Sequence, residues 1–548
     1  MHNRGTSFSP LDRQTHALVG LLPAAVETAG KQVLRAKIQF DLCPTSICKY
    51  SFLRELEEDL TDLFYTFVSK HLLEVLIIIY MPTVGEACIR FSELWRKPKG
   101  AFVTAGHKGR MRQILNYVPD VVHIIVVTDG GRILGLSDQG ANGMGIPIGK
   151  VALYVAGAGF DPAHALPVSL DFGTNNEKLL ADPLYIGARH RRLPDVEYFE
   201  LIDEILCAVK DKWPRCLVQL EYFATHHSLP LLAKYRSRML CFNDDIQGTG
   251  SVILAGLLNA LAIQGTAFKD ARIVFYGAGS AAVGCAQTII AMLISLGVRE
   301  EDAYKQFWVL DSKGLLTSDR PDMAEIRVRA PHKLPFMRTD MKTCEPARMC
   351  DRSTFGKHEV ESMHKYCARP IICPLSNPTS KAEISAKKAY AWTSGQCIFA
   401  SGSPFDPVTN NGQTYAPAQG NNMCVFPGVG LGAFLCGATK VTDAMFIEAA
   451  ICLSEMVDPE SLKAGALYPP LEQLRNISAL VAATTIECAI RDGQSKLTFS
   501  SRGEVLAFVH AGMWSPPQFD EPATFYMRAD GDQAADYLDE DDTPHLCT

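Results

Sequence analysis

The sequence predicts an α/β protein: a helical N-terminal region, a middle α/β domain, and a later domain built on a doubly wound parallel sheet. Three observations predict this. Apolar positions recur at helical spacing over residues 53–67. Apolar, β-branched runs at 123–128 and 217–220 are typical of buried strands, and a Gly130-Gly131 turn follows the first. From about Asn243 the pattern alternates strand, helix and strand, which is typical of a doubly wound sheet.

The clearest alternation is a strand at 271–276, a helix at 280–296 and a strand at 307–310. A glycine motif, Gly277-x-Gly279-x-x-Ala282, joins the first strand to the helix. Its glycines form the turn and let the backbone approach a pyrophosphate, whose charge meets the free N–H groups of the helix N-terminus. The motif therefore predicts a Rossmann-type dinucleotide site with these contact residues: Gly277, Gly279, Ser280, Ala281 and Ala282.

The acid that binds the ribose of a dinucleotide usually ends the next strand, about 20 residues after the glycine motif. Asp311 ends that strand here, and the longer distance is explained by an extended connection over 297–305. Ser312 and Lys313 follow it and could bind an adenosine 2′-phosphate, so NADP is slightly favoured over NAD. The alternative is that Ser312-Lys313 is only a polar turn.

Composition narrows the classes of partner. The chain has 548 residues, 47% hydrophobic and 21% charged, with a net charge of −7 and no long basic run, which argues against a nucleic-acid partner. The 17 cysteines are scattered without CxxC pairs, as in proteins with reduced thiols. The longest apolar run, 72–81, is too short to span a membrane, and no signal peptide is visible. We expect a cytoplasmic protein, with a mitochondrial location as the alternative.

Two carboxylates are predicted metal ligands. Glu221 ends the strand at 217–220, and Asp245 begins a helix, so both should face the crevice at the carboxyl edge of the sheet. Mg²⁺ and Mn²⁺ prefer such oxygen ligands. The alternative for Asp244-Asp245 is that the pair only caps the helix.

Lys150 and Tyr80 are the predicted acid–base groups. Lys150 follows three glycines and a proline, and a lysine that is partly desolvated near a metal loses proton affinity and can act as a general base. The phenol of Tyr80 could return a proton. Each could instead be structural, because single lysines are usually solvated and single tyrosines usually half-buried.

With these residues in view, the chain closely resembles the malic enzyme family over most of residues 4–495. The resemblance rests on segments found in the family's order: 4–6, 20–23, 80–85, 127–130, 132–136, 143–150, 242–249, 375–379, 400–405, 419–422 and 467–470. Malic enzymes oxidise L-malate with NAD or NADP and decarboxylate the product to pyruvate and CO₂, using Mg²⁺ or Mn²⁺. The resemblance implies tetramers built from dimers.

The resemblance also implies roles for individual residues. Lys150 would take the proton of the malate hydroxyl, Asp244 would tune Lys150, and Tyr80 would protonate the enol. The cation would act as a Lewis acid. Arg132 would clamp a malate carboxylate. The substrate and the nicotinamide would be contacted by side-chain amides, those of Asn377, Asn421 and Asn422.

The chain departs from the family in two places. The family's metal triad is Glu-Asp plus a later Asp, whereas this chain has Glu221-Tyr222, so the second carboxylate is missing and metal binding should weaken. Between Asp311 and Asn377 the family has a further apolar strand and a second glycine-rich loop. This chain has the polar segment 344–352 and only Gly356 there, so we expect a missing or altered strand.

We therefore predict four regions: 1–56, helical with oligomer contacts; 57–243, the substrate and metal domain; 244–497, the NAD(P)-binding domain; and 498–548, an extension whose acidic end should be disordered. The predicted function is oxidative decarboxylation of L-malate. One alternative is a catalytically impaired member of the family with a binding or regulatory role. The other is an oxaloacetate decarboxylase.

Overall fold

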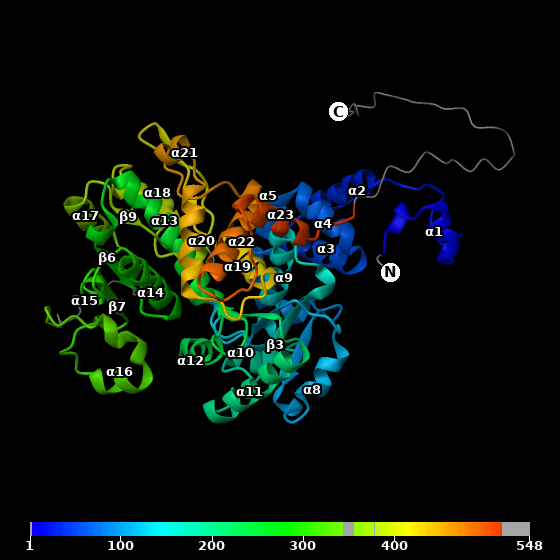
Figure 1. The fold of residues 1–548 in the computed structure, drawn as a ribbon, viewed down its shortest axis with the longest axis horizontal. Helices are drawn as coiled ribbons and strands as arrows, with labels where there is room; N and C mark the ends of the chain where they lie inside the picture. The colour runs from blue at the N-terminus through cyan, green and yellow to red at the C-terminus, as the bar shows by residue number, and fades with distance from the viewer. Residues whose placement is uncertain (1–2, 343–355, 378, 518–548) are drawn as a thin grey trace.

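A computed structural model of the chain describes residues 3–342, 356–377 and 379–517. The N-terminal region is helical, as predicted, and the apolar positions of 53–67 lie on two of its helices (Figure 1). The side chain of Thr28 caps the second helix by accepting a hydrogen bond from the N–H of Lys31. The helices are α1 (Pro10–Thr15), α2 (Ala29–Leu42), α3 (Ser46–Asp59), α4 (Thr61–Lys70), α5 (Leu72–Ile79), α6 (Thr83–Ile89) and α7 (Phe91–Leu94).

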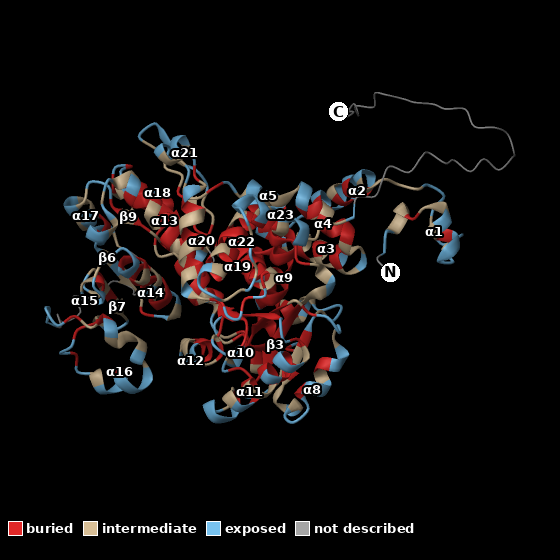
Figure 2. Ribbon diagram, viewed as in Figure 1, coloured by how far each residue is buried: buried red, intermediate tan, exposed pale blue. Residues whose placement is uncertain are grey.

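The middle domain is built on a parallel sheet of five strands in the order β1-β3-β2-β4-β5. The predicted strands at 123–128 and 217–220 are confirmed as the neighbours β2 and β4. Helices cover the sheet, whose interior is buried (Figure 2). The elements are β1 (Ala101–Thr104), α8 (Met111–Ile114), β2 (Ile124–Thr128), α9 (Gly145–Ala158), β3 (Ala165–Asp171), α10 (Glu177–Ala181), α11 (Asp195–Lys212), β4 (Leu217–Leu220), α12 (Thr225–Tyr235) and β5 (Cys241–Asn243).

A second lobe follows, and its strand–helix–strand unit is confirmed: β6 pairs with β7 in parallel, and α14 connects them. Helix α13 ends, as such helices often do, at a left-handed glycine, Gly265, with φ 75°. The elements are α13 (Thr249–Gln264), β6 (Ile273–Tyr276), α14 (Ser280–Ser295), α15 (Glu300–Tyr304), β7 (Phe307–Asp311), β8 (Gly314–Leu315), α16 (Met323–Arg329), α17 (Lys357–Tyr366), β9 (Ile371–Ile372), α18 (Ala386–Trp392), β10 (Ile398–Ser401), β11 (Val408–Asn410), β12 (Gln413–Tyr415) and β13 (Ala418–Gln419).

The strands of this lobe are divided between sheets. Among the described residues, one sheet has the order β6-β7-β8 and another the order β13-β10-β9, and no strand is shared by the two; β11 and β12 form a separate hairpin. Strand β6 is therefore an edge strand, and Val274 in it is 58% exposed. The segment 344–352, for which a missing or altered strand was predicted, lies outside the described residues, so that expectation stays a prediction.

Of the C-terminal helices, α19, α20 and α22 lie between the two lobes (Figure 1). Helix α19 packs on α22, and α20 packs on both α22 and α13, so the C-terminal part of the chain joins the lobes. The helices are α19 (Phe426–Leu435), α20 (Asp443–Glu455), α21 (Pro459–Lys463), α22 (Leu474–Arg491) and α23 (Arg502–Gly512). The acidic end predicted to be disordered falls on residues 518–548, which are outside the described part of the chain.

Two stretches, Leu72–Ile89 and Asp244–Gln264, have the length and apolar composition of membrane-spanning helices. However, 61% of the first and 72% of the second is buried inside the protein. Buried core helices have the same composition, so these stretches are weak evidence for a membrane span.

Candidate active site

The predicted acid–base and metal residues meet at the carboxyl edge of the five-stranded sheet. Glu221 directly follows β4, and Asp244 and Asp245 follow β5 in a π-helical turn, Asp244–Gly248. Lys150 reaches them from α9, and Tyr80 lies at the end of α5. The carboxyl ends of parallel strands meet at one edge of a sheet, which explains why residues up to 165 positions apart in sequence share one site.

Lys150 is fully buried and ion-paired. Its Nζ contacts the Asp244 carboxylate closely and lies 3.2 Å from Oε1 of Glu221. The amine also lies 4.3 Å from the ring centre of Phe426 and 5.3 Å from that of Tyr80, distances at which an aromatic ring attracts a cation. The contact between Lys150 and Asp244 is the one that the resemblance implies.

The negative charges of the site outnumber its positive charge. Two buried carboxylates, those of Glu221 and Asp244, and the half-buried carboxylate of Asp245 surround one lysine. Burial lowers the pKa of Lys150, but Asp244 and then Glu221 outweigh it and hold that pKa well above its ordinary value. Burial raises the pKa of Glu221 to about 7, and burial and the neighbouring carboxylates raise the pKa of Asp245. Lys150 is thus a protonated cation in this arrangement, contrary to the expected loss of proton affinity.

A divalent cation fits this pocket. Oδ1 of Asp244 is buried and accepts no hydrogen bond, and Oε1 of Glu221 is buried with the Lys150 ammonium 3.2 Å away. The other carboxylate oxygens are oriented: Oε2 of Glu221 accepts from Nε2 of Gln219 at 2.6 Å, and Oδ2 of Asp245 accepts from the N–H of Tyr222 at 2.6 Å. Such oriented carboxylates, in excess over the single lysine, are typical ligands of Mg²⁺ or Mn²⁺. Glu221 and Asp245 would hold the cation.

Tyr222, at the place of the missing carboxylate, has an uncommon backbone. Its φ is 54°, a left-handed conformation that bulky side chains rarely adopt. The side chain is buried, so the phenol occupies the pocket wall without supplying a charge. The carbonyl of Tyr222 accepts a hydrogen bond from the N–H of Arg132 at 3.1 Å. The loop after β4 therefore fixes the backbone of the predicted carboxylate clamp, whose side chain is exposed.

Of the three predicted amides, that of Asn422 contacts the acid–base residues directly. Nδ2 of Asn422 donates to Oδ2 of Asp244 at 3.1 Å and to Oγ1 of Thr249 at 2.9 Å. Asn421 caps the short helix that begins at Asn422, accepting from the N–H of Met423 at 3.0 Å. Asn377 accepts from Ser403, and its carbonyl accepts from the N–H of Gly135 at 3.1 Å, close in sequence to Arg132.

The glycine motif forms an open turn before α14. Gly277 has φ 141°, and side-chain atoms added at Gly277 or Gly279 would meet open space. No side chain caps α14, so its first N–H groups are free to bind an anion, with Ser280, Ala281 and Ala282 in the first turn. This cradle fits a dinucleotide pyrophosphate.

Helix α14 connects the glycine turn to the acid–base pocket. Gly284 lies directly against the Asp244–Gly248 turn, and a Cβ there would collide with the carbonyl of Ile246. The absence of a side chain at Gly284 therefore permits this close approach, and the helix that would bind the cofactor buttresses the turn carrying two of the carboxylates.

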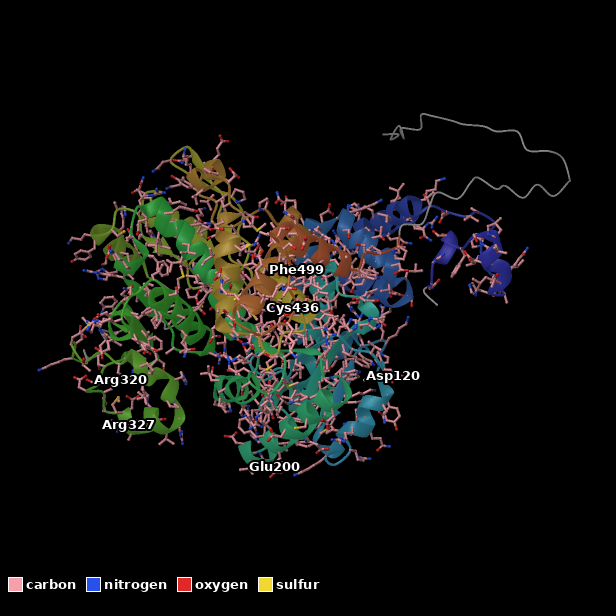
Figure 3. The ribbon with its side chains drawn as sticks, in the orientation of Figure 1. Asp120, Glu200, Arg320, Arg327, Cys436 and Phe499 are labelled. Atoms are coloured by element: carbon pink, nitrogen blue, oxygen red, sulfur yellow. The ribbon has the colours of Figure 1, made fainter. Side chains whose placement is uncertain are left out.

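Asp311 is not a free acid. Its carboxylate pairs with NH1 of Arg320 (labelled in Figure 3) at 2.9 Å and with Nζ of Lys333 at 2.8 Å, while Ser312 is exposed. Burial acts to raise the pKa of Asp311, but Lys333 and Arg320 outweigh it and lower that pKa. The carboxylate predicted to bind the ribose is therefore paired with two cations.

Sequence reasoning missed a buried network behind Arg132. The Asp129 carboxylate accepts from the Tyr198 hydroxyl at 2.9 Å and pairs with NH1 of Arg192 at 3.2 Å. Asp129 stands in the segment 127–130 on which the resemblance rests, which was the available signal. Nothing in the sequence marked Arg192 or Tyr198.

Comparisons with known proteins identify the family of the chain. The family model described as malic enzyme, N-terminal domain, matches residues 57–236, and the one described as malic enzyme, NAD binding domain, matches residues 246–490. An NADP-dependent malic enzyme of Dictyostelium discoideum is 45% identical over 506 residues, covering 90% of this chain and 93% of that protein. An NAD-dependent malic enzyme of Aliivibrio fischeri is 42% identical over 510 residues, covering 90% and 91%.

Solved structures share the fold. The Entamoeba histolytica malic enzyme superposes with a TM-score of 0.57 at 22% identity, covering 91% of this chain and 90% of that one. The malic enzyme of Pyrococcus horikoshii superposes with a TM-score of 0.53 at 22% identity, covering 80% and 89%.

Proposed function

The chain belongs to the malic enzyme family, and on that premise we propose that it oxidises L-malate with NADP or NAD and decarboxylates the product to pyruvate and CO₂. The observation that carries the proposal is the buried contact of Lys150 with Asp244 and Glu221, beside Tyr80. A protonatable amine, excess carboxylates and a phenol in one buried cluster are what the two proton transfers of this reaction require.

Lys150 would act as the general base on the malate hydroxyl. Its amine must first lose a proton, and Glu221, one of the two carboxylates that raise its pKa, would also help to hold the cation. Once Glu221 and Asp245 are engaged in binding Mg²⁺ or Mn²⁺, their attraction for the lysine proton falls and Lys150 becomes a better base. When bound, the cation supplies Lewis-acid polarisation of the substrate oxygens.

Tyr80 would return a proton at C3 after CO₂ leaves. Burial raises the pKa of Tyr80 to about 12, so the phenol is protonated at neutral pH and serves as an acid. Arg132 would bind a malate carboxylate, and Asn377 and Asn421 would orient the substrate against the nicotinamide, which accepts the hydride. Asn422 would keep Asp244 in place through its hydrogen bond.

We propose NADP as the preferred cofactor. In this proposal Arg320 and Lys333, which neutralise Asp311, would turn toward an adenosine 2′-phosphate, and the exposed Ser312 would add a hydrogen bond. NAD remains the alternative, since relatives of both kinds are similar to this chain. Lys333→Ala should raise KM for NADP more than KM for NAD; an equal effect on both would favour NAD.

The decisive assay follows reduced nicotinamide and CO₂ separately, with L-malate, Mn²⁺ and either cofactor. Equal amounts of both products support the proposal, and Lys150→Ala should abolish them. CO₂ from oxaloacetate without nicotinamide reduction from malate would instead indicate an oxaloacetate decarboxylase. No product from well-folded protein would favour the second candidate, an impaired family member that binds or regulates, for which Tyr222 is the specific motive.

We further propose that the chain self-associates through its N-terminal helices, as a dimer or dimer of dimers. Leu34, Ile38 and Leu42 of α2 are 61%, 55% and 76% exposed and, four residues apart, form an apolar stripe on one helix face. Ile38→Glu should lower the mass measured by light scattering. An unchanged mass would place the contact elsewhere. We propose a cytoplasmic location, with a mitochondrial one as the alternative, testable by a fluorescent fusion.

A further inference from the structure

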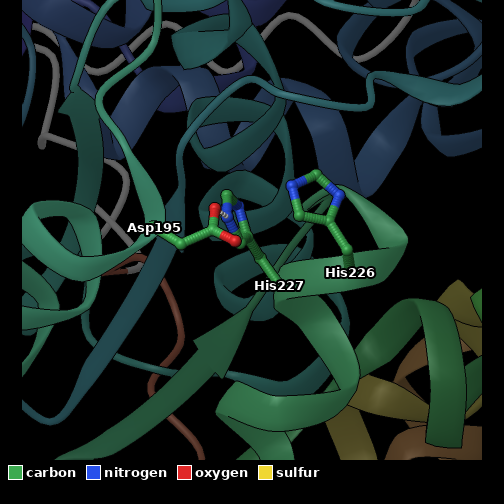
Figure 4. A group of neighbouring side chains, drawn as sticks. All are labelled: Asp195, His226 and His227. Atoms are coloured by element: carbon green, nitrogen blue, oxygen red, sulfur yellow. Dashed lines mark hydrogen bonds and ion pairs between the residues drawn. The ribbon is translucent and has the colours of Figure 1, made fainter. Parts of the chain in front are cut away.

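Asp195, His226 and His227 lie together where helices α11 and α12 begin (Figure 4). One possible ligand atom from each lies within 4.8 Å of the others, and Nε2 of His227 is 3.1 Å from Oδ1 of Asp195. Among the described residues, no other group of three or more histidines, cysteines, aspartates or glutamates is so closely spaced. We propose that these three side chains bind a divalent transition-metal ion of the Zn²⁺ type, at a site separate from Glu221 and Asp245.

His227 is held as metal-ligating histidines are held. Its ring is buried and lies stacked on Tyr198, with ring centroids 3.9 Å apart and planes 14° apart. The ring of Phe199 packs against it in a T-shaped arrangement, with centroids 5.4 Å apart. Nδ1 is buried without a hydrogen-bond partner and lies 3.9 Å from Oδ2 of Asp129. A ligating histidine usually directs its second nitrogen toward a carboxylate, which fixes the ring and strengthens the bond to the ion.

The other two ligands can adapt. A tetrahedral ion with bonds of about 2.0–2.1 Å keeps neighbouring ligand atoms about 3.3 Å apart, so the group must contract by roughly 1–1.5 Å. His226 is exposed and the Asp195 side chain is 68% exposed, so both can rotate toward the buried ring without disturbing the core. Water would occupy the fourth position.

The donor set selects the kind of ion. Two imidazoles and one carboxylate suit Zn²⁺ or Co²⁺, whereas Mg²⁺ prefers oxygen ligands. The N-termini of two helices and the nearby Arg192 oppose a cation, while Asp195, Asp129 and Asp138 favour one. Without an ion, the same residues would be only a hydrogen-bonded link between α11 and α12, and an experiment separates the two cases.

The test is a Co²⁺ titration of the full-length protein in excess Mg²⁺, followed by visible absorption. The excess Mg²⁺ occupies oxygen-only sites. Co²⁺ bound by nitrogen and oxygen gives ligand-field bands without a thiolate charge-transfer band, which excludes binding by any of the 17 cysteines. We expect one Co²⁺ per chain, displaced by Zn²⁺, and at least tenfold weaker binding in His226→Ala and in Asp195→Asn.

Glu197→Gln, an exposed acid in the first turn of α11, is the matched control and should bind Co²⁺ as the wild-type protein does. Thermal unfolding of each variant checks the fold, and His226→Ala, a surface change, keeps the test valid if Asp195→Asn unfolds. The proposal is overturned if Co²⁺ does not bind in excess Mg²⁺, if the spectrum shows thiolate ligands, or if His226→Ala binds as tightly as the wild-type protein.

Discussion

Replacing Lys150 by methionine removes the cation that is paired with the two buried carboxylates of Glu221 and Asp244. At an effective dielectric constant of about 20, opposite charges 3.2 Å apart, the separation of Lys150 from Glu221, attract by about 5 kcal/mol. Desolvation of the amine offsets part of this, and breaking a buried pair costs about 3–5 kcal/mol because a charge is left uncompensated. In a domain of 150–250 residues that loss lowers Tm by about 6 °C or more.

The assay is thermal unfolding of the cation-free protein at pH 5.5 and at pH 8. Because the pKa of Glu221 is about 7, its carboxyl is protonated at the lower pH and needs no counter-charge. The deficit of Lys150→Met should therefore be larger at pH 8, and Mn²⁺ should partly remove it. Lys97→Met, which breaks only an exposed pair with Asp59, should leave Tm unchanged. An equal deficit at both pH values, or none, would refute the reasoning.

Three further predictions concern the same elements. The folded-state pKa of Glu221, about 7, lies above its ordinary value of 4.5, so the folded state holds a proton that the unfolded state releases between these values. Stability of the cation-free protein should then fall as pH rises from about 4.5 to 7, and Mn²⁺ should raise Tm more at pH 8 than at pH 6; equal shifts would contradict this. Tyr222→Asp should tighten Mn²⁺ binding, measured by calorimetry, about tenfold, or about 1.4 kcal/mol. Tyr222→Asn, whose side chain also tolerates the left-handed backbone, should not tighten it. Similar affinities of the two variants would show that the added charge is irrelevant. Gly277→Ala should weaken NADP binding several-fold in a fluorescence titration because φ 141° is open only to glycine, while Gly493→Ala, at a distant left-handed turn, should not; unchanged binding in Gly277→Ala would argue against the glycine cradle.

The sequence predicted the elements that have a strong local signal. The β-branched run ending at Thr128 forms a strand as predicted, because a strand buried on both faces requires a continuous apolar sequence. The glycine turn at Gly277 also lies where the pattern predicted it. The contact between Lys150 and Asp244 could be expected only from the resemblance, since 94 residues separate them and no periodicity links them.

Other features arise from tertiary packing and leave no local pattern. Asp195 and His227 meet because α11 and α12 begin side by side, so their spacing in sequence carries no ligand motif. The left-handed backbone of Tyr222 is an example of the same limit: local preference disfavours it, and the hydrogen bonds of its N–H to Asp245 and of its carbonyl to Arg132 accompany it. The pairing of Asp311 with two cations likewise depends on residues that follow it by 9 and 22 positions.

The edge position of β6 has a consequence for the aggregation of the protein on heating. Among the described residues β6 pairs with β7 on one side only, and the exposed Val274 adds an apolar surface to its other side. Strands of other molecules can pair with such an edge. Heat-induced precipitation should therefore begin in this lobe before the five-stranded sheet unfolds. A bound dinucleotide would make the adjoining glycine turn more rigid and so delay this aggregation. The protein should therefore remain soluble for longer when it is stored with its cofactor.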